Sequence, residues 1–210
     1  MRKILSILFL MSALALNVQA QDIRALFVEA PDSVFPLLPR SERADCVDFV
    51  DAGMEYPVSN LLGGKSMLKE IKGNYLLLQS SAVSTVQLKA LPYEGSYVIC
   101  VVNTVSAEAA DSRVAFFDSE WRRIRDKEFF TSPSIGDFFI QDSEELCDLC
   151  DIYLVSLKMS GDDDTIVAEY TMPAYMNPED AANVRPQLRK IVYRWDGCRF
   201  VIDRDIPSRP

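Results

Sequence analysis

Six consecutive apolar residues, from Tyr97 to Val102, constrain the fold of this chain more than any other stretch. A strand with one face in water alternates apolar and polar residues, so an unbroken run rich in β-branched residues is typical of a strand covered on both faces. A second strand is predicted at Arg113–Phe117, and Asp118-Ser119-Glu120 is predicted to turn the chain into a third strand at Trp121–Ile124. We therefore expect an antiparallel meander with a buried strand at the centre of the protein.

The residues on either side of this meander follow helical and strand periodicities in turn. Helices are predicted at Ile23–Ala30, Ser41–Ala52 and Ser66–Gly73, with a further helix start at Pro133 and a capped helix from Asp142 to Cys150. Asp196-Gly197 is a strong hairpin signal between the last two predicted strands. The strands predicted outside the central meander are Tyr75–Gln79, Thr85–Leu91, Ile152–Met159, Thr165–Met172, Leu188–Trp195 and Arg199–Ile202.

Together these elements predict an α+β fold, with a helical N-terminal region packed on largely antiparallel sheet and two meander-like halves. The stretches that begin at Leu88 and Leu157 align without a gap, each as a strand, a polar turn and a second strand. This match leaves two interpretations open, a weak internal duplication or a single sheet with repetitive hairpins. The expected regions are a signal peptide at 1–20, a helical N-terminal region at 21–73, a first β-meander at 74–130, a helical interlude at 131–150 and a second β-meander at 151–210.

The first twenty residues have the three parts of a cleaved signal peptide. Arg2 and Lys3 precede a nearly unbroken apolar run from Ile4 to Leu16, and Val18-Gln19-Ala20 supplies small residues before a cut. The apolar run is too short for a comfortable transmembrane helix, and no later run approaches the length of a span. We expect cleavage after Ala20, a location in the periplasm, outside the cell or on the cell surface, and no membrane span in the mature chain.

The chain is acidic and contains no histidine. It has 22 Lys and Arg against 31 Asp and Glu, a formal net charge of −9, and loss of Arg2 and Lys3 with the signal peptide would make this charge −11. A charge of this sign repels phosphate backbones, so we expect no nucleic-acid partner and favour a cationic or neutral one. The absence of histidine excludes Ser-His-Asp and Cys-His catalysis and imidazole metal sites.

Cys147 and Cys150 have the spacing of a redox or metal-binding motif, but their surroundings oppose that chemistry. A reactive dithiol needs nearby positive charge, whereas the segment from Glu144 to Asp151 is acidic and should raise the thiol pKa values. No second cysteine pair completes a zinc site. We therefore predict an inert, buried helix face made of Leu146, Cys147, Leu149 and Cys150.

The five cysteines are an odd number for an exported chain, so at least one stays free or pairs between chains. Cys100 lies inside the predicted buried strand and is expected to be an inert core thiol. The disulfide connectivity stays open among Cys46, Cys100, Cys147, Cys150 and Cys198.

Two short motifs have more ordinary interpretations. Gly64-Lys65-Ser66 resembles the end of a phosphate-binding loop, but the glycine that such a loop needs five residues earlier is Ser59, so we interpret Ser66 as a helix cap. Asp162-Asp163-Asp164 offers carboxylate oxygens to calcium but lacks a spaced ligand series, so we prefer a solvated hairpin turn.

No pattern singles out a catalytic, cofactor-binding or metal-ligating residue, and we expect no cofactor. The preferred function is a non-enzymatic binding or assembly protein of the bacterial envelope, with an envelope protein or a glycan as its partner. The alternative is a carboxylate-dependent glycan hydrolase, which needs two acids roughly 5–10 Å apart in one cleft. Aromatic residues on strands are the candidates for a binding surface, and four are selected: Trp121, Tyr175, Tyr193 and Trp195.

Four segments spread over residues 22–203 carry a resemblance to a known family: Ala30-Pro31-Asp32-Ser33, Asp48-Phe49-Val50-Asp51, Asn60-Leu61-Leu62-Gly63-Gly64 and Tyr193-Arg194-Trp195-Asp196-Gly197. Through them the chain resembles a family of exported bacterial proteins that is catalogued as a domain of unknown function. The resemblance implies export and a shared fold. It carries no catalytic residue over to this chain.

Overall fold

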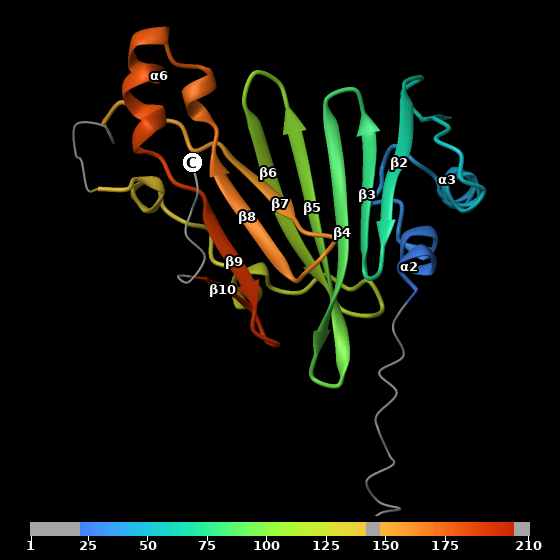
Figure 1. Cartoon of the computed structure of the whole chain (residues 1–210). Coiled ribbons are helices and arrows are strands. Elements are labelled where there is room, and N and C mark those ends of the chain that lie inside the picture. The colour runs from blue at the N-terminus through green and yellow to red at the C-terminus, as the bar shows by residue number, and fades with distance from the viewer. Residues whose placement is uncertain (1–21, 142–147, 204–210) are drawn as a thin grey trace, which may run out of the picture.

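The structure, a computed structural model, describes residues 22–141 and 148–203. It contains a six-stranded antiparallel sheet of order β1-β2-β3-β4-β5-β6 and a four-stranded antiparallel sheet of order β10-β9-β8-β7 (Figure 1). The strands are β1 (Val58–Ser59), β2 (Lys65–Lys72), β3 (Tyr75–Ser81), β4 (Ser84–Tyr93), β5 (Ser96–Ser106), β6 (Ala110–Phe117), β7 (Val155–Met159), β8 (Thr165–Tyr170), β9 (Ile191–Trp195) and β10 (Phe200–Ile202). The helices are α2 (Ile23–Glu29), α3 (Arg40–Asp51), α4 (Asp126–Phe129) and α6 (Pro178–Val184), with single 3-10 turns η1 (Gly136–Phe138), η2 (Met172–Ala174) and η3 (Arg185–Gln187).

Strand β5, which lies next to the edge strand β6, is covered on both faces, as its apolar run predicts. Ile99 and Val101 belong to a core cluster shared with α2, α3 and the strands β2 to β4. Val98, Cys100 and Val102 belong to a second cluster shared with β7 to β10. All five side chains are at most 2% exposed, so Cys100 is the buried core thiol that the sequence predicts.

The N-terminal helices and the second sheet therefore lie on opposite sides of the first sheet (Figure 1). Ile23, Leu26 and Phe27 make up the buried side of α2, which Asp22 caps through a 3.0 Å hydrogen bond from the backbone N–H of Arg24. Cys46 is buried on α3 in the same cluster. Over the described ranges, no helix has the length and apolar character of a membrane span.

The edge of β7 is held by side chains of the first sheet rather than by another strand. Gln87 of β4 donates from Nε2 to the carbonyl oxygen of Leu157 at 2.9 Å and accepts from the N–H of Met159 at 2.8 Å. The Oγ atom of Ser112 on β6 accepts from the N–H of Leu157 at 2.9 Å. Because these side chains satisfy the outer backbone groups of β7, the two sheets are joined where this edge crosses the first sheet.

Most predicted elements are present with shifted ends. The predicted helices Ile23–Ala30 and Ser41–Ala52 correspond to α2 and α3, and every strand predicted outside Trp121–Ile124 overlaps one of β3 to β10. β5 and β8 do not pair, so the two meander-like halves are separate sheets and a single continuous sheet is wrong. The internal duplication stays a prediction, since β4–β5 and β7–β8 are both simple hairpins.

The predicted helix at Ser66–Gly73 is wrong, because this segment is strand β2. Ser66 and Leu68 are buried while the residues between and after them are more exposed, which is the period-two alternation of a strand. Leu68 pairs with Leu78 of β3, and the Oγ atom of Ser66 donates to the carbonyl oxygen of Ser80 at 2.7 Å. The helical part of the predicted 21–73 region therefore ends with α3, and Ser66 caps no helix.

The predicted strand Trp121–Ile124 is also absent. The Asp118 carboxylate accepts hydrogen bonds from the backbone N–H groups of Glu120 and Arg122 at 2.9 and 3.0 Å. Trp121 consequently sits at φ 61°, in the left-handed region, where a strand cannot continue. An isolated bridge between Phe117 and Arg123 remains.

The helical interlude is only partly as predicted. Pro133 starts no helix, and the helical turn that follows is η1. Residues 142–147, with Leu146, Cys147 and the start of the predicted capped helix, lie outside the described residues. Cys150 is buried, but Leu149 is 40% exposed, so the predicted buried face is wrong at Leu149.

Helix α6 is not among the helices predicted from the sequence. Its start carries an ordinary signal, since the Asn177 side chain accepts from the N–H groups of Glu179 and Asp180 and Pro178 occupies the first turn. The short length of the helix hid it between two predicted strands.

Candidate binding groove

A groove of about 810 Å³ runs along the outer edge of β6. One wall is β6 itself, and the other is formed by Phe130 to Pro133 and by Tyr153, Val155 and Leu157 at the start of the second sheet. Arg123, Asp126 and Lys127, on and before α4, line one end. The groove thus joins three segments that are far apart in the sequence.

The backbone of β6 is open to this groove only in its middle. β6 pairs with β5 alone, and in an antiparallel pair every second residue directs its N–H and C=O groups away from its neighbour. The carbonyl oxygen of Ala110 accepts from the Thr171 hydroxyl at 2.6 Å. At the other end Phe116 donates to the Asp126 carboxylate and accepts from the N–H of Ile124, both at 3.0 Å. Ser112 and Val114 lie between these covered ends.

The charge of the groove is opposite to that of the whole chain. Arg113, Arg123 and Lys127 line it together with a single carboxylate, Asp126. That carboxylate is engaged by Arg123 and by the backbone of Phe116. Arg113 and Lys127 form no ion pair with any residue in the described ranges. The groove therefore favours an anionic partner, in contrast to the cationic or neutral partner that the net charge of the chain suggests.

The exposed residues of the far wall are Thr131, Ser132 and Tyr153, while its apolar members Phe130, Val155 and Leu157 are buried. Tyr153 is 43% exposed, and its hydroxyl donates to the carbonyl oxygen of Pro133 at 2.9 Å. Burial of this hydroxyl raises the pKa of Tyr153 above its usual value, so the group stays a neutral donor. Sequence reasoning missed Tyr153, because nothing in the run before β7 distinguishes an exposed ring from a buried one.

The four aromatic residues selected from the sequence do not form one surface. Tyr193 is 2% exposed, packs against Phe130 with tilted rings whose centroids are 4.8 Å apart, and donates to the carbonyl oxygen of Thr131. Trp195 is 8% exposed and donates from Nε1 to the carbonyl oxygen of Pro92 at 2.8 Å. The rings of these two residues fill the core between the sheets, and neither residue lines the groove beside β6.

The other two selected residues lie apart from each other and from the groove. Trp121 packs against Phe117, with ring centroids 5.4 Å apart, beside the cluster that contains the N-terminal helices. Tyr175 follows η2 and is 48% exposed. Neither residue lines the groove beside β6.

A second cavity, of about 550 Å³, lies between the end of β8 and the segment after α6. It also contains cations, but they are already engaged: Lys190 lies 3.5 Å from the carboxylate of Glu169, and Arg189 donates to the carbonyl oxygen of Asp137 at 2.9 Å. Glu108 and Glu169 both line this cavity. It is thus less suited to a charged ligand than the groove beside β6.

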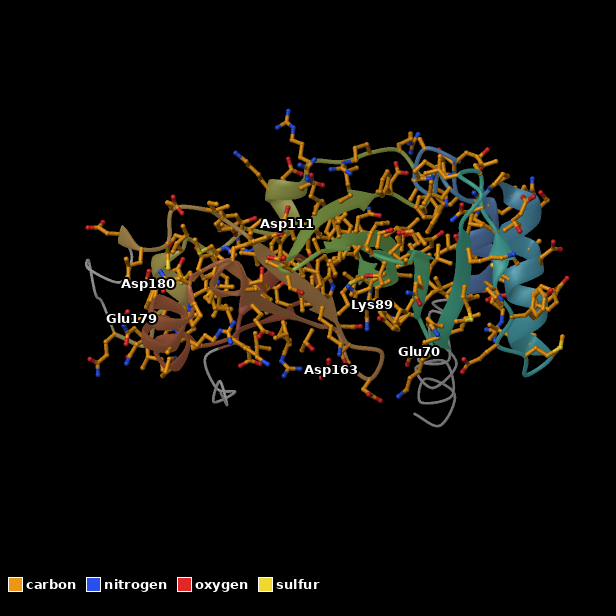
Figure 2. All side chains as sticks on the ribbon, turned by 90° about the horizontal axis from the view of Figure 1, so that it is seen from above. Glu70, Lys89, Asp111, Asp163, Glu179 and Asp180 are labelled. Carbon is orange, nitrogen blue, oxygen red and sulfur yellow. The ribbon has the colours of Figure 1, made fainter. Side chains whose placement is uncertain are left out.

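The acidic turn between β7 and β8 holds a lysine. Lys89 reaches out of β4 to this turn, and Figure 2 shows Lys89 and Asp163 close together where the first sheet meets the second. Lys72 pairs with Asp162, which is 80% exposed. No group of three or more metal-ligating side chains comes together in the part of the chain that the structure describes.

The Gly64-Lys65-Ser66 motif spans the last residue of a turn and the first two residues of β2. The Asn60 side chain accepts from the N–H groups of Leu62 and Gly64, and Lys65 donates to the Ser59 hydroxyl at 3.0 Å. The backbone donors of this turn are therefore partly used within the protein itself, which does not suit a phosphate-binding loop.

The comparisons with known proteins agree with the resemblance seen in the sequence. The chain belongs to DUF3256, a family described as proteins of unknown function, whose family model matches residues 15–200. It is similar to the solved structure of a domain of an uncharacterized protein from Porphyromonas gingivalis W83, at 28% identity and a TM-score of 0.75. That likeness covers 86% of this chain and 98% of the other. No curated protein matches the chain.

Proposed function

We propose that this chain is a non-enzymatic binding protein of the bacterial envelope, which holds an anionic partner in the groove beside β6. The observation that carries the proposal is the charge reversal in that groove, where Arg113 and Lys127 stand without ion pairs to described residues in a chain of net charge −9. Unpaired cations in a groove attract an acidic partner and orient it.

The groups in the groove support binding better than catalysis. The Asp126 carboxylate is occupied by Arg123 and the Phe116 backbone. The Ser112 hydroxyl accepts from the N–H of Leu157 and is hydrogen-bonded to the Thr104 hydroxyl at 2.8 Å. A nucleophile needs a free base within hydrogen-bond distance, and these contacts leave neither group in that role.

The alternative, a glycan hydrolase, has less support. It requires two carboxylates that face one substrate. The groove contributes one acid. The cavity near α6 is lined by two, Glu108 and Glu169, and of these Glu169 is paired with Lys190. The envelope location remains part of the proposal and rests on the N-terminal sequence, with export after cleavage at Ala20.

Site-specific photo-crosslinking in the native cell tests the proposed function. A photo-reactive amino acid in place of Tyr153 should yield a discrete crosslinked partner, and the double reversal Arg113→Glu with Lys127→Glu should abolish that product. The same photo-reactive group in place of exposed Lys69, on the opposite edge of the first sheet, is the control. Identical products from both positions, or turnover of envelope glycans by the purified chain, would contradict the proposal.

A further inference from the structure

We infer, on the basis of the proposed function, that the partner presents an acidic peptide segment in extended conformation, which adds to β6 as a strand at Ser112–Val114. Strand addition to an open sheet edge is a general mode of peptide recognition, in which backbone hydrogen bonds give affinity and alternate side chains give specificity.

The ladder between β5 and β6 fixes which backbone groups face the groove. Its register runs without a shift from Ile99 opposite Phe117 to Ser106 opposite Ala110. Since the Phe116 N–H and C=O bond outward to Asp126 and Ile124, the residues at steps of two from Phe116 are also directed outward. Ser112 and Val114 therefore present two donors and two acceptors to the groove, and no described residue hydrogen-bonds to these backbone groups.

The other sheet edges within the described ranges are protected against such pairing. The edge of β7 is satisfied by Gln87 and Ser112, and β10 has only three residues. The edge of β2 carries a register shift between Leu68 and Glu70 and the exposed charges of Lys69 and Lys72. Bulges, charges and short strands are the usual devices that block an edge. The middle of β6 has no register shift and lies in a groove.

The length of the open edge limits the size of the peptide. Thr171 covers Ala110 at one end, and Asp126 and Ile124 cover Phe116 at the other. About five residues of β6 separate these contacts, which corresponds to about 17 Å of extended chain. The site thus fits a short segment rather than a whole sheet of another protein.

Side-chain alternation on β6 predicts the sequence pattern of the segment. Val114 packs with the cluster that contains Val155 and Leu157, whereas Arg113 is exposed on the opposite face of the strand. A neighbouring strand places its side chains on the same two faces. We therefore expect apolar residues on the Val114 face to alternate with Asp or Glu on the Arg113 face.

Binding of a defined peptide to the purified full chain tests this inference. The probe is an acetylated and amidated octapeptide of alternating Glu and Val with a fluorescent label, and the readout is anisotropy. N-methylation of every second amide gives two matched peptides, one methylated at the Glu amides and the other at the Val amides. One of them should bind about tenfold or more weakly, because its methyl groups remove the donors that face β6, and the other should bind as well as the parent.

Protein variants give an independent readout. Val114→Pro removes the outward N–H at a strand edge where proline is tolerated, and should weaken binding by about tenfold or more, whereas Val114→Ala should have little effect. Arg113→Glu should weaken binding, and Lys69→Glu, with the same charge change on the opposite edge of the sheet, should not. Circular dichroism checks that each variant is folded, and the N-methylated peptides test the inference on the unaltered chain.

Three results would overturn the inference. If both N-methylated peptides bind like the parent but Arg113→Glu abolishes binding, the groove binds acidic side chains without strand addition, and the proposed function still stands. If no alternating peptide binds while Tyr153 crosslinks a partner, the class of partner is wrong. If the chain forms a dimer that Val114→Pro dissociates, the occupant of the edge is a second copy of the chain.

Discussion

The ammonium group of Lys89 lies 3.1 Å from the carboxylate of Asp164, and so connects the middle of the first sheet to the first hairpin of the second. Lys89 is 1% exposed and also donates to the carbonyl oxygens of Ser160 and Asp163, at 2.7 and 2.6 Å. Backbone oxygens and a carboxylate are the groups that a metal cation would use in this turn. The position that the sequence leaves open to calcium is thus filled by a cation of the protein.

Replacement of Lys89 should destabilise the protein strongly. Lys89→Met keeps the length of the side chain but leaves two carbonyl oxygens without their donor and the Asp164 carboxylate without its cation, which should lower the free energy of unfolding by about 2–4 kcal/mol. Urea denaturation followed by circular dichroism measures this loss. Lys158→Met, at an exposed position of β7, should change the free energy by about 0.5 kcal/mol or less. Equal effects of the two variants would show that the buried contacts of Lys89 contribute little.

Arg43 has a similar role on the other side of the first sheet. Its guanidinium is 1% exposed and donates to the carbonyl oxygens of Leu38, Ala30 and Val28 and to the Asp32 carboxylate. Arg43→Met removes the donor of these acceptors and should lower the free energy of unfolding by about 3 kcal/mol. The midpoint of thermal unfolding should fall accordingly.

Arg40 provides the matched control for Arg43 on the same helix. Its ion pair with Glu29 is exposed on both sides, so Arg40→Met should lower stability by at most about 1 kcal/mol. Calorimetry that finds Arg40→Met as destabilising as Arg43→Met would contradict the assignment of Arg43 as a buried structural residue.

The fall in the free energy of unfolding at acidic pH should depend on Asp137. Its carboxylate accepts from the hydroxyl and the backbone N–H of Ser134, both at 2.7 Å, and these bonds lower the pKa of Asp137. A carboxyl whose pKa is lower in the folded state stabilises the fold above its unfolded pKa, and this contribution is lost as the pH falls through its folded pKa. Asp137→Asn should therefore lessen the fall in unfolding free energy between about pH 5 and pH 2. An unchanged slope in Asp137→Asn, with exposed Asp148→Asn as the control, would refute this role.

Three of the cysteines should differ sharply in reactivity. Burial raises the pKa of Cys46 to about 11 and raises the pKa of Cys100 as well, whereas Cys198 is exposed beside the turn after β9. Because the thiolate is the reactive form, Cys198→Ser should remove one rapidly reacting thiol in a titration with a thiol probe at pH 8. Cys46→Ser and Cys100→Ser should remove none under native conditions. Rapid labelling of Cys46 or Cys100 in the folded chain would be inconsistent with this core.

The elements that the sequence predicts well are those that the residues of the segment itself determine. The unbroken run at Val98–Val102 requires cover on both faces, and two packing layers provide it. Ser66–Gly73 was mispredicted because its few apolar residues fit a short helix, and its pairing with β3 decides for a strand. Trp121 was mispredicted because the hydrogen bonds of the Asp118 side chain, rather than strand propensity, determine the backbone there.

The groove was beyond prediction from the sequence because its residues meet only in the folded chain. Arg113, Lys127 and Tyr153 lie in three segments with no common motif. The burial of Tyr193 and Trp195 was equally hidden, because an aromatic residue on a strand is buried or exposed according to which face the second sheet covers. The net charge of the chain suggested a cationic or neutral partner, because a net charge does not show that the cations Arg113 and Lys127 gather in one groove of an acidic chain.

Amide hydrogen exchange at Ser112 and Val114 tests the central claim most directly. In the free chain these two N–H groups should exchange much faster than those of Arg113 and Ala115, which face β5. Addition of the alternating Glu-Val peptide should slow exchange at Ser112 and Val114 by about tenfold or more and leave Arg113 and Ala115 unchanged. Exchange at Ser112 and Val114 that is already slow in the free chain, or that the saturating peptide does not slow, would contradict the account.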